Sequence, residues 1–202
     1  MIAKNTLLIY QFSLLNLPQV DNQLLTQFEQ RRYQQLSTEK QSTYLTTRNI
    51  LRHILAQHHI PPVSLDYTPQ GKAIIVPPFS NFSLSLTHSQ DIWMVGLMET
   101  NSLGIDLQIP LPKNPGALRS RCNLKTTTST QDLMQHWCLC EAYCKLSQTS
   151  LWSALRTPIA TVIIEKSLYY YHQSKPNFAA VATTPIHKIL FIDGKNQLFS
   201  RN

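Results

Sequence analysis

The sequence predicts an α+β fold made of two similar halves, and three observations support this prediction. Each half contains one long segment in which apolar residues recur with helical spacing, at 38–58 and at 131–147. Each of these segments is accompanied by several short apolar runs with the length and boundaries of β-strands. The composition of the 202-residue chain, 43% hydrophobic and 14% charged, is that of a folded protein rather than a disordered one. This order of elements indicates a pseudo-duplicated arrangement, although the two halves show no direct sequence repeat.

The expected strands are short apolar runs that end at turn-forming residues. Residues 82–86, Phe-Ser-Leu-Ser-Leu, alternate between apolar and polar side chains, which is the pattern of a half-buried strand. Pro69-Gln70-Gly71 is a turn signal between two of the runs. The expected strands lie at 7–12, 65–67, 72–76, 82–86, 92–97, 103–107, 159–164, 167–171, 178–183 and 189–192.

The first long helix is expected to begin at Thr38, because Thr38 and Gln41 have the spacing of a capping box. Pro61-Pro62 ends it. A shorter helical segment precedes it at 24–33. The stretch 111–131, which is rich in Pro, Asn, Ser and Thr and basic in character, is expected to be a loop before the second long helix.

The formal net charge of +7 favours an anionic partner, such as a nucleic acid, a nucleotide cofactor, an acidic protein or a membrane surface. No block of five or more like charges occurs, which argues against a nucleic-acid-binding tail. No 18 consecutive residues are apolar, so no membrane span is expected, and residues 1–17 read as a strand rather than a signal peptide. The four cysteines lack the paired Cys-x-x-Cys spacing of a zinc site, which favours free thiols in a reducing cytoplasm.

Two short segments carry the side chains with the clearest chemical potential. In Gly104-Ile105-Asp106-Leu107-Gln108, the strand alternation directs Asp106 and Gln108 to one side. In Trp137–Lys145, the helical spacing brings Glu141 and Lys145 to one face. If the fold joins these segments, two carboxylates, an amide and a cation suit a hard divalent cation and a phosphorylated ligand. The simpler interpretation is that Asp106 ends a strand and that Glu141 is a solvated acid paired with Lys145.

Four segments follow one another in the order found in a known enzyme family, and a fifth segment matches more weakly. Gln70-Gly71-Lys72 is similar to a Gly-Lys-Pro turn of that family, and Leu84–Ser89 is similar to its Phe-Asn-x-Ser-His-Ser segment. Gly104–Gln108 resembles Gly-Ile-Asp-Ile-Glu, and Trp137–Lys145 resembles Trp-x-x-Lys-Glu-Ala-x-x-Lys. A weaker match is Arg48–Arg52, which resembles an Arg-x-Leu-Leu-Arg helix. Over about residues 30–185 the chain therefore resembles the 4′-phosphopantetheinyl transferases of the larger, surfactin-synthetase-activating type.

The resemblance implies a Mg²⁺-dependent enzyme that transfers the 4′-phosphopantetheine arm of coenzyme A to a serine of an acyl or peptidyl carrier protein. The other product is 3′,5′-ADP, and nucleic acid is not an expected partner. The family fold implies a monomeric, cytoplasmic protein of two lobes, 1–102 and 103–202. Each lobe is expected to pack a long helix on an antiparallel sheet, with coenzyme A in the cleft between the lobes.

The resemblance also implies roles for individual residues. The metal ligands are Asp106, Gln108 and Glu141, and Glu141 is in addition a candidate base for the serine hydroxyl. Asp106, Glu141 and Lys145 form the catalytic set, in which Lys145 stabilises the departing phosphate. The residues implied to bind coenzyme A are Arg48, Lys72, Thr87, His88 and Lys145.

The chain departs from the family pattern at several points. Gln108 replaces a glutamate, which predicts weaker metal affinity, and Cys140 replaces a lysine expected near the phosphates. The stretch 111–131 lacks the Phe-Phe-Ser-x-x-Glu segment that helps the family to receive its carrier protein. These changes leave an alternative open, a degenerate, non-catalytic module that binds coenzyme A or a carrier protein. Arg52 is expected on a solvated helix face.

Overall fold

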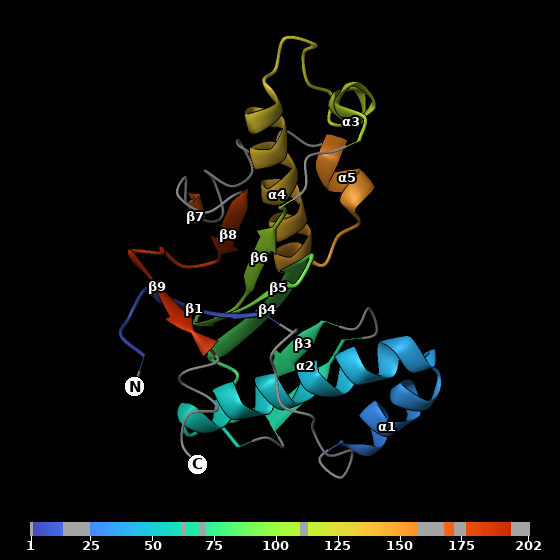
Figure 1. Ribbon diagram of the computed structural model, residues 1–202. Helices are drawn as coiled ribbons and strands as arrows, with labels where there is room; N and C mark the ends of the chain where they lie inside the picture. Colours follow the sequence, from blue (N-terminus) through green and yellow to red (C-terminus); the bar gives the residue numbers. More distant parts are fainter. Residues whose placement is uncertain are drawn as a thin grey trace.

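The computed structural model describes residues 2–13, 25–61, 64–68, 72–109, 113–156, 168–171 and 177–194. It confirms the α+β class, with helices and several small sheets. The two long helices, α2 (Thr38–Gln57) and α4 (Thr130–Ser147), lie on opposite sides of the strands (Figure 1). Within the described ranges, no helix combines the length and the apolar character that crossing a membrane requires.

The first sheet has four strands in the order β4-β5-β1-β9. Its members are β1 (Thr6–Ser13), β4 (Phe82–Ser89), β5 (Ile92–Glu99) and β9 (Lys188–Asp193). Neighbouring strands are antiparallel except that β9 pairs in parallel with β1. The expectation of an antiparallel sheet is therefore wrong here, because the period-two pattern of a strand does not encode the direction of its neighbour.

The second sheet is antiparallel and has three strands in the order β6-β8-β7. These strands are β6 (Leu103–Leu107), β8 (Phe178–Ala182) and β7 (Leu168–Tyr171). A separate hairpin joins β2 (Leu65–Tyr67) to β3 (Ala73–Ile75). The turn predicted at 69–71 and the strand predicted at 159–164 lie outside the described residues.

The hydrophobic core shows how these elements are layered. Alternate residues of β1 face opposite ways: Leu8 and Tyr10 pack against the apolar face of α2, whereas Leu7 and Ile9 pack against the second sheet. On its other face the second sheet packs Val181 against α4. The order of layers is therefore α2, first sheet, second sheet, α4.

The two sheets also meet along one edge, through side chains rather than through backbone pairing. One edge of β6 pairs with β8, while its other edge faces β4. There the backbone N–H groups of Ile105, Leu107 and Ile109 donate to hydroxyl oxygens of β4 at 3.0, 3.2 and 3.0 Å. These oxygens belong to Ser85, Thr87 and Ser89, which we call the hydroxyl seam. Three hydroxyl groups of β4 thus accept backbone N–H groups along the edge of β6 that does not pair with β8.

The predicted capping box at the start of α2 is wrong. Thr38 is the first helical residue of α2, and its N-cap Ser37 makes no side-chain capping bond. The capping box belongs to the preceding helix, α1 (Gln27–Gln34), where Thr26 and Glu29 exchange side-chain and backbone hydrogen bonds.

Two short helices were not predicted, α3 (Pro115–Arg121) and α5 (Leu151–Arg156). Helix α3 lies within the stretch that was expected to be a loop. It carries a start signal that the composition obscures, because Asn114 caps it through its side chain and Pro115 occupies its first turn.

Candidate functional site

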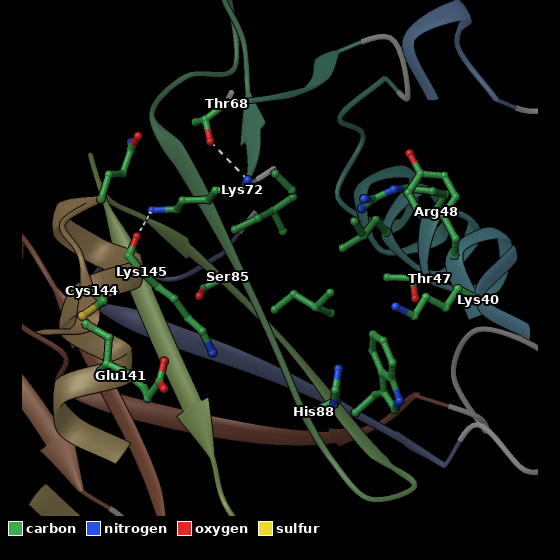
Figure 2. A pocket seen from close by; sticks show the side chains of 18 of the residues that line it. Lys40, Thr47, Arg48, Thr68, Lys72, Ser85, His88, Glu141, Cys144 and Lys145 are labelled. Carbon is green, nitrogen blue, oxygen red and sulfur yellow. Dashed lines mark hydrogen bonds between the residues drawn. The ribbon is translucent and has the colours of Figure 1, made fainter. Parts of the chain in front are cut away.

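A pocket of about 650 Å³ lies over the hydroxyl seam, between α2 on one side and α4 on the other (Figure 2). Five of the predicted site residues line it, although they come from four separate segments of the chain: Arg48, Lys72, His88, Glu141 and Lys145. The other three predicted residues, Thr87, Asp106 and Gln108, are not among its lining residues. The fold therefore brings most of the predicted site together.

The charge of the pocket favours an anionic ligand. Among the residues that the structure describes, four cationic side chains, from Lys40, Arg48, Lys72 and Lys145, line the pocket together with a single acid, Glu141. A concave site with an excess of one charge concentrates ligands of the opposite sign. Phosphate groups meet this requirement, since arginine and lysine are their usual partners.

Asp106 is buried beside the pocket, with only 4% of its surface exposed. Its Oδ1 atom accepts hydrogen bonds from Lys145 Nζ at 2.8 Å and from Thr87 Oγ1 at 3.0 Å. Its Oδ2 atom is buried and has no hydrogen-bond partner among the described residues. A buried carboxylate oxygen without a partner is costly, so this atom is suited to a ligand that supplies positive charge.

Gly104 explains why Asp106 lies so close to α4. A Cβ atom at this position would collide with the backbone carbonyl of Ala142 in α4. Gly104 and Asp106 lie on the same face of β6, because they are two positions apart. The absence of a side chain at residue 104 thus lets α4 approach the strand and bring Lys145 within reach of Asp106.

Glu141 is half-buried and points from α4 in the same direction as Lys145 (Figure 2). Burial raises the pKa of its carboxyl group above the ordinary value, and the negative charge of Asp106 raises this pKa further. The positive charge of Lys145 acts against both effects. The two carboxylates therefore interact electrostatically, as the sequence motifs predict.

Asp106 and Glu141 are the two carboxylates at this site that could hold a divalent cation. Within the described residues, no group of three or more His, Cys, Asp and Glu side chains is arranged to hold a metal. Mg²⁺ does not need such a cage, because it commonly uses one or two carboxylates and takes its other ligands from water and substrate phosphates. Asp106, with its unpartnered Oδ2, and Glu141 supply this minimum. The backbone of Gln108 is held by Asn177. The Gln108 N–H donates to the backbone carbonyl of Asn177 at 3.0 Å, and Nδ2 of Asn177 donates to the backbone carbonyl of Gln108 at 2.9 Å.

The two lysines make specific contacts across the pocket. Lys145 Nζ donates to the backbone carbonyl of Ile105 at 2.9 Å as well as to Asp106, so it is held against β6. Lys72 Nζ donates to the backbone carbonyl of Lys145 at 2.5 Å (Figure 2). Burial lowers the pKa of the Lys72 ammonium group. Lys72 thus connects the hairpin side of the pocket to α4.

Arg48 is held in place by aromatic rings and a buried acid. Its guanidinium carbon lies 4.5 Å from the ring centroid of Tyr44 and 4.2 Å from that of Tyr67. Its Nε lies 3.8 Å from Oε1 of Glu29, which is fully buried. Glu29 also forms an ion pair with Arg52. The expected solvated position of Arg52 is therefore wrong, because its charge is neutralised by an acid of α1.

Thr87 and His88, which are neighbours in the predicted motif, lie in different environments. His88 is exposed at the pocket, and its ring lies 4.4 Å from the ring of Trp93. Thr87 points the other way along β4 and is buried in the hydroxyl seam, where Asp106 and Leu107 use its hydroxyl group. Its implied contact with coenzyme A is not supported by this location.

Cys140 does not lie where the family lysine was expected to act. Its side chain is fully buried, in the apolar cluster that also contains Cys122 of the α3 end. One residue along a helix corresponds to a rotation of about 100°, so residue 140 points away from the face that carries Glu141. The expectation that this substitution removes a cation from the pocket is wrong. All four cysteines are free thiols.

Two lining residues, Lys40 and Tyr44, were missed from the sequence. Their signal was present, because residues 40, 44 and 48 are spaced by four and share one face of α2 with Arg48. Comparison with known proteins adds no family assignment: no protein-family model matches the chain, and no curated protein sequence matches it.

Proposed function

We propose that this protein is a Mg²⁺-dependent 4′-phosphopantetheinyl transferase that modifies a serine of an acyl or peptidyl carrier protein. One observation carries the proposal. Arg48, Lys72, His88, Glu141 and Lys145 were selected from separate motifs, and all of them line one cationic pocket. Asp106 is buried beside that pocket, and its Oδ2 atom has no hydrogen-bond partner by geometry among the described residues. A chance set of polar residues has no reason to converge in this way.

The layered fold supports the finer proposal of a pseudo-duplicated, two-lobe transferase. Helix α2 packs on the first sheet and α4 on the second, and Leu84, Ser85 and Leu86 of β4 line the pocket between the two helices. The proposed boundary between residues 102 and 103 falls between β5 and β6. β9 belongs to the second lobe by sequence and completes the sheet of the first. We propose a cytoplasmic monomer with coenzyme A in this pocket.

In the proposed reaction, the serine oxygen of the carrier protein forms a bond to the β-phosphorus of coenzyme A. The bond from that phosphorus to the 3′,5′-ADP oxygen breaks, and the serine proton is transferred to Glu141. Glu141 is the acid among the described residues that line the pocket, which places it to take this proton. Lys40, Arg48 and Lys72 bind the anionic groups of coenzyme A, which positions the phosphorus for attack.

Asp106 and Glu141 would hold the metal ion, which when bound supplies charge neutralisation to the pyrophosphate. Lys145 orients the buried Asp106 carboxylate through its 2.8 Å contact. Gln108 provides an amide where the family has a carboxylate, so the metal site carries one negative charge fewer. A low metal affinity, and hence a need for high Mg²⁺ concentrations, follows from this difference.

The test is incubation with coenzyme A, Mg²⁺ and apo carrier proteins of the fatty-acid, polyketide and peptide-synthetase types, with mass spectrometry of each carrier. We expect at least one carrier to gain a phosphopantetheine arm, and the Asp106→Asn variant to leave it unmodified. If every carrier keeps its mass across a range of Mg²⁺ concentrations, the proposed transferase is wrong.

The second candidate is a non-catalytic module that binds coenzyme A or a carrier protein, which the loss of the carboxylate at Gln108 favours. Calorimetry separates the two candidates. Coenzyme A binding without any transfer identifies the module. Transfer that is restored or accelerated by Gln108→Glu identifies the enzyme.

A further inference from the structure

The three hydroxyl groups of the hydroxyl seam do not make equivalent contacts. Ser85, Thr87 and Ser89 each accept one backbone N–H of the segment that contains β6, at 3.0, 3.2 and 3.0 Å. Of the three, Thr87 is the one that also donates to a described residue, to Oδ1 of Asp106 at 3.0 Å. A hydroxyl group has a single proton, and Thr87 commits that proton to the carboxylate.

The geometry around Asp106 divides its two oxygens into different roles. Both donors, Lys145 and Thr87, contact Oδ1. The torsion that rotates a carboxylate about its last bond is broad and poorly restrained on its own. Two donors that converge on one oxygen from different elements, α4 and β4, fix this torsion. Oδ2 is thereby left buried in a defined position, without a hydrogen-bond partner among the described residues by geometry. The Cys138 thiol lies near this carboxylate, and burial, followed by the charge of Asp106, raises the pKa of Cys138.

Thr87 is badly placed for direct contact with a ligand. It does not line the pocket, and its hydroxyl group is already committed, since it accepts from the N–H of Leu107 and donates to Oδ1 of Asp106. The influence of Thr87 on ligand binding must therefore act through Asp106.

We infer that Thr87 is a positioning residue, which holds the Asp106 carboxylate so that Oδ2 is presented to a divalent cation. This inference rests on the proposed function in one respect, which is that Asp106 binds a cation. Without the Thr87 hydroxyl, Lys145 becomes the single donor to Oδ1. The carboxylate is then free to rotate, and either of its oxygens can turn to the ammonium group. A cation then has to compete with Lys145 for Asp106.

The experiment compares four variants with the unaltered protein. Thr87→Val keeps the shape of the side chain and removes the hydroxyl, whereas Thr87→Ser retains it. Ser89→Ala is the matched control, because it removes the same kind of bond to a β6-segment N–H without touching Asp106. Thr87→Cys, with a weakly donating thiol, provides a milder change if Thr87→Val does not fold. Circular dichroism and thermal unfolding report the fold of each variant.

The readout is binding of Mg²⁺ and of Mn²⁺ to the coenzyme A-free protein, by calorimetry and by electron paramagnetic resonance. We expect Thr87→Val to weaken cation binding about tenfold and Thr87→Cys to weaken it by less. Thr87→Ser should remain within about twofold of the unaltered protein. Ser89→Ala should lower the unfolding temperature while leaving cation binding unchanged. Coenzyme A binding without metal should be the same in all five proteins.

Two results would overturn the inference. One is equal loss of cation binding in Thr87→Val and Ser89→Ala, which would give Thr87 a purely structural role. The other is the absence of cation binding by the unaltered protein. Failure of the proposed function is a separate outcome, in which the unaltered protein binds the cation and modifies no carrier protein.

Discussion

Lys72 Nζ lies 2.5 Å from the backbone carbonyl oxygen of Lys145, close to the C-terminal end of α4. The last carbonyl groups of a helix have no partner within the helix, and they carry its negative partial charge. The neighbouring carbonyl, that of Leu146, accepts a hydrogen bond from Ser102 Oγ at 2.8 Å. Two side chains from outside α4 thus cap its end, and one of them also lines the pocket.

Lys72→Met tests whether Lys72 both caps α4 and binds the ligand, and Ser102→Ala is the control, because Ser102 caps α4 and does not line the pocket. Each substitution removes one capping hydrogen bond, so we expect each to lower the free energy of unfolding by about 1 kcal/mol. Only Lys72→Met also removes a pocket cation, and it should weaken coenzyme A binding about tenfold or more. Denaturant unfolding and calorimetry measure the two effects. Equal coenzyme A affinities in the two variants would exclude Lys72 from the binding site.

The Asp106–Lys145 ion pair predicts an asymmetry between its two partners. Lys145→Met leaves a carboxylate that is 6% exposed without its cation, and we expect a loss of about 2 kcal/mol in the free energy of unfolding. Asp106→Asn should cost less, because the Lys145 side chain is 30% exposed and keeps its contact with the carbonyl of Ile105. Paired denaturant titrations of the two variants check this order. A larger loss in Asp106→Asn would contradict it.

The raised pKa of Glu141 predicts how stability depends on pH. In the window between the ordinary value of 4.5 and the higher pKa of the folded protein, the folded state binds more protons than the unfolded state. The free energy of unfolding therefore falls as the pH rises through this window. Glu141→Gln should remove this contribution and leave a protein that is more stable than the unaltered one at pH 7 without metal.

Thermal unfolding from pH 4 to pH 8 measures this effect, with and without Mg²⁺. Added Mg²⁺ should stabilise the unaltered protein at pH 7 and leave Glu141→Gln nearly unchanged, because the variant lacks the carboxylate that the cation compensates. A variant that is less stable than the unaltered protein at pH 7 without metal would contradict the assigned pKa direction.

Two glycine substitutions test the close approach of β6 and α4. Gly104→Ala would place a methyl group against the backbone carbonyl of Ala142, which cannot move away as a side chain does. We expect a loss of about 3 kcal/mol, at the upper end of the range for overpacked cores. Gly116→Ala is the control, since its nearest neighbour would be Asn114 Oδ1 at 3.6 Å. It should be neutral or stabilising by up to about 1 kcal/mol, because alanine is the better helix former.

The sequence predicted the elements whose periodicity is strong and the site residues whose motifs are local. Helices α2 and α4 begin within one residue of the predicted positions, and the strands from β1 to β6 lie where the apolar runs are. The site was predictable because the expected ligands lie in short segments at strand ends and on one helix face. Their arrangement around one pocket depends on the layering, which periodicity does not contain.

The errors have a common physical origin, since each concerns a partner that is distant along the chain. Arg52 reads as a solvated helix residue until its buried partner Glu29 is known. Cys140 reads as a pocket residue until it is known to lie in the apolar cluster that contains Cys122, at the end of α3. The parallel pairing of β9 with β1 joins the two ends of the described chain. Such long-range pairings cannot be read from local patterns.

The place of β9 at the edge of the first sheet affects the protein while it is being made. The strand beside it, β1, is synthesised before every other strand of this sheet, but its neighbour β9 is complete only after Asp193 has been synthesised. Until then, one side of β1 exposes backbone N–H and C=O groups that can pair with another chain. The nascent protein therefore passes through a period in which it needs protection from aggregation. The late arrival of β9 ends this period.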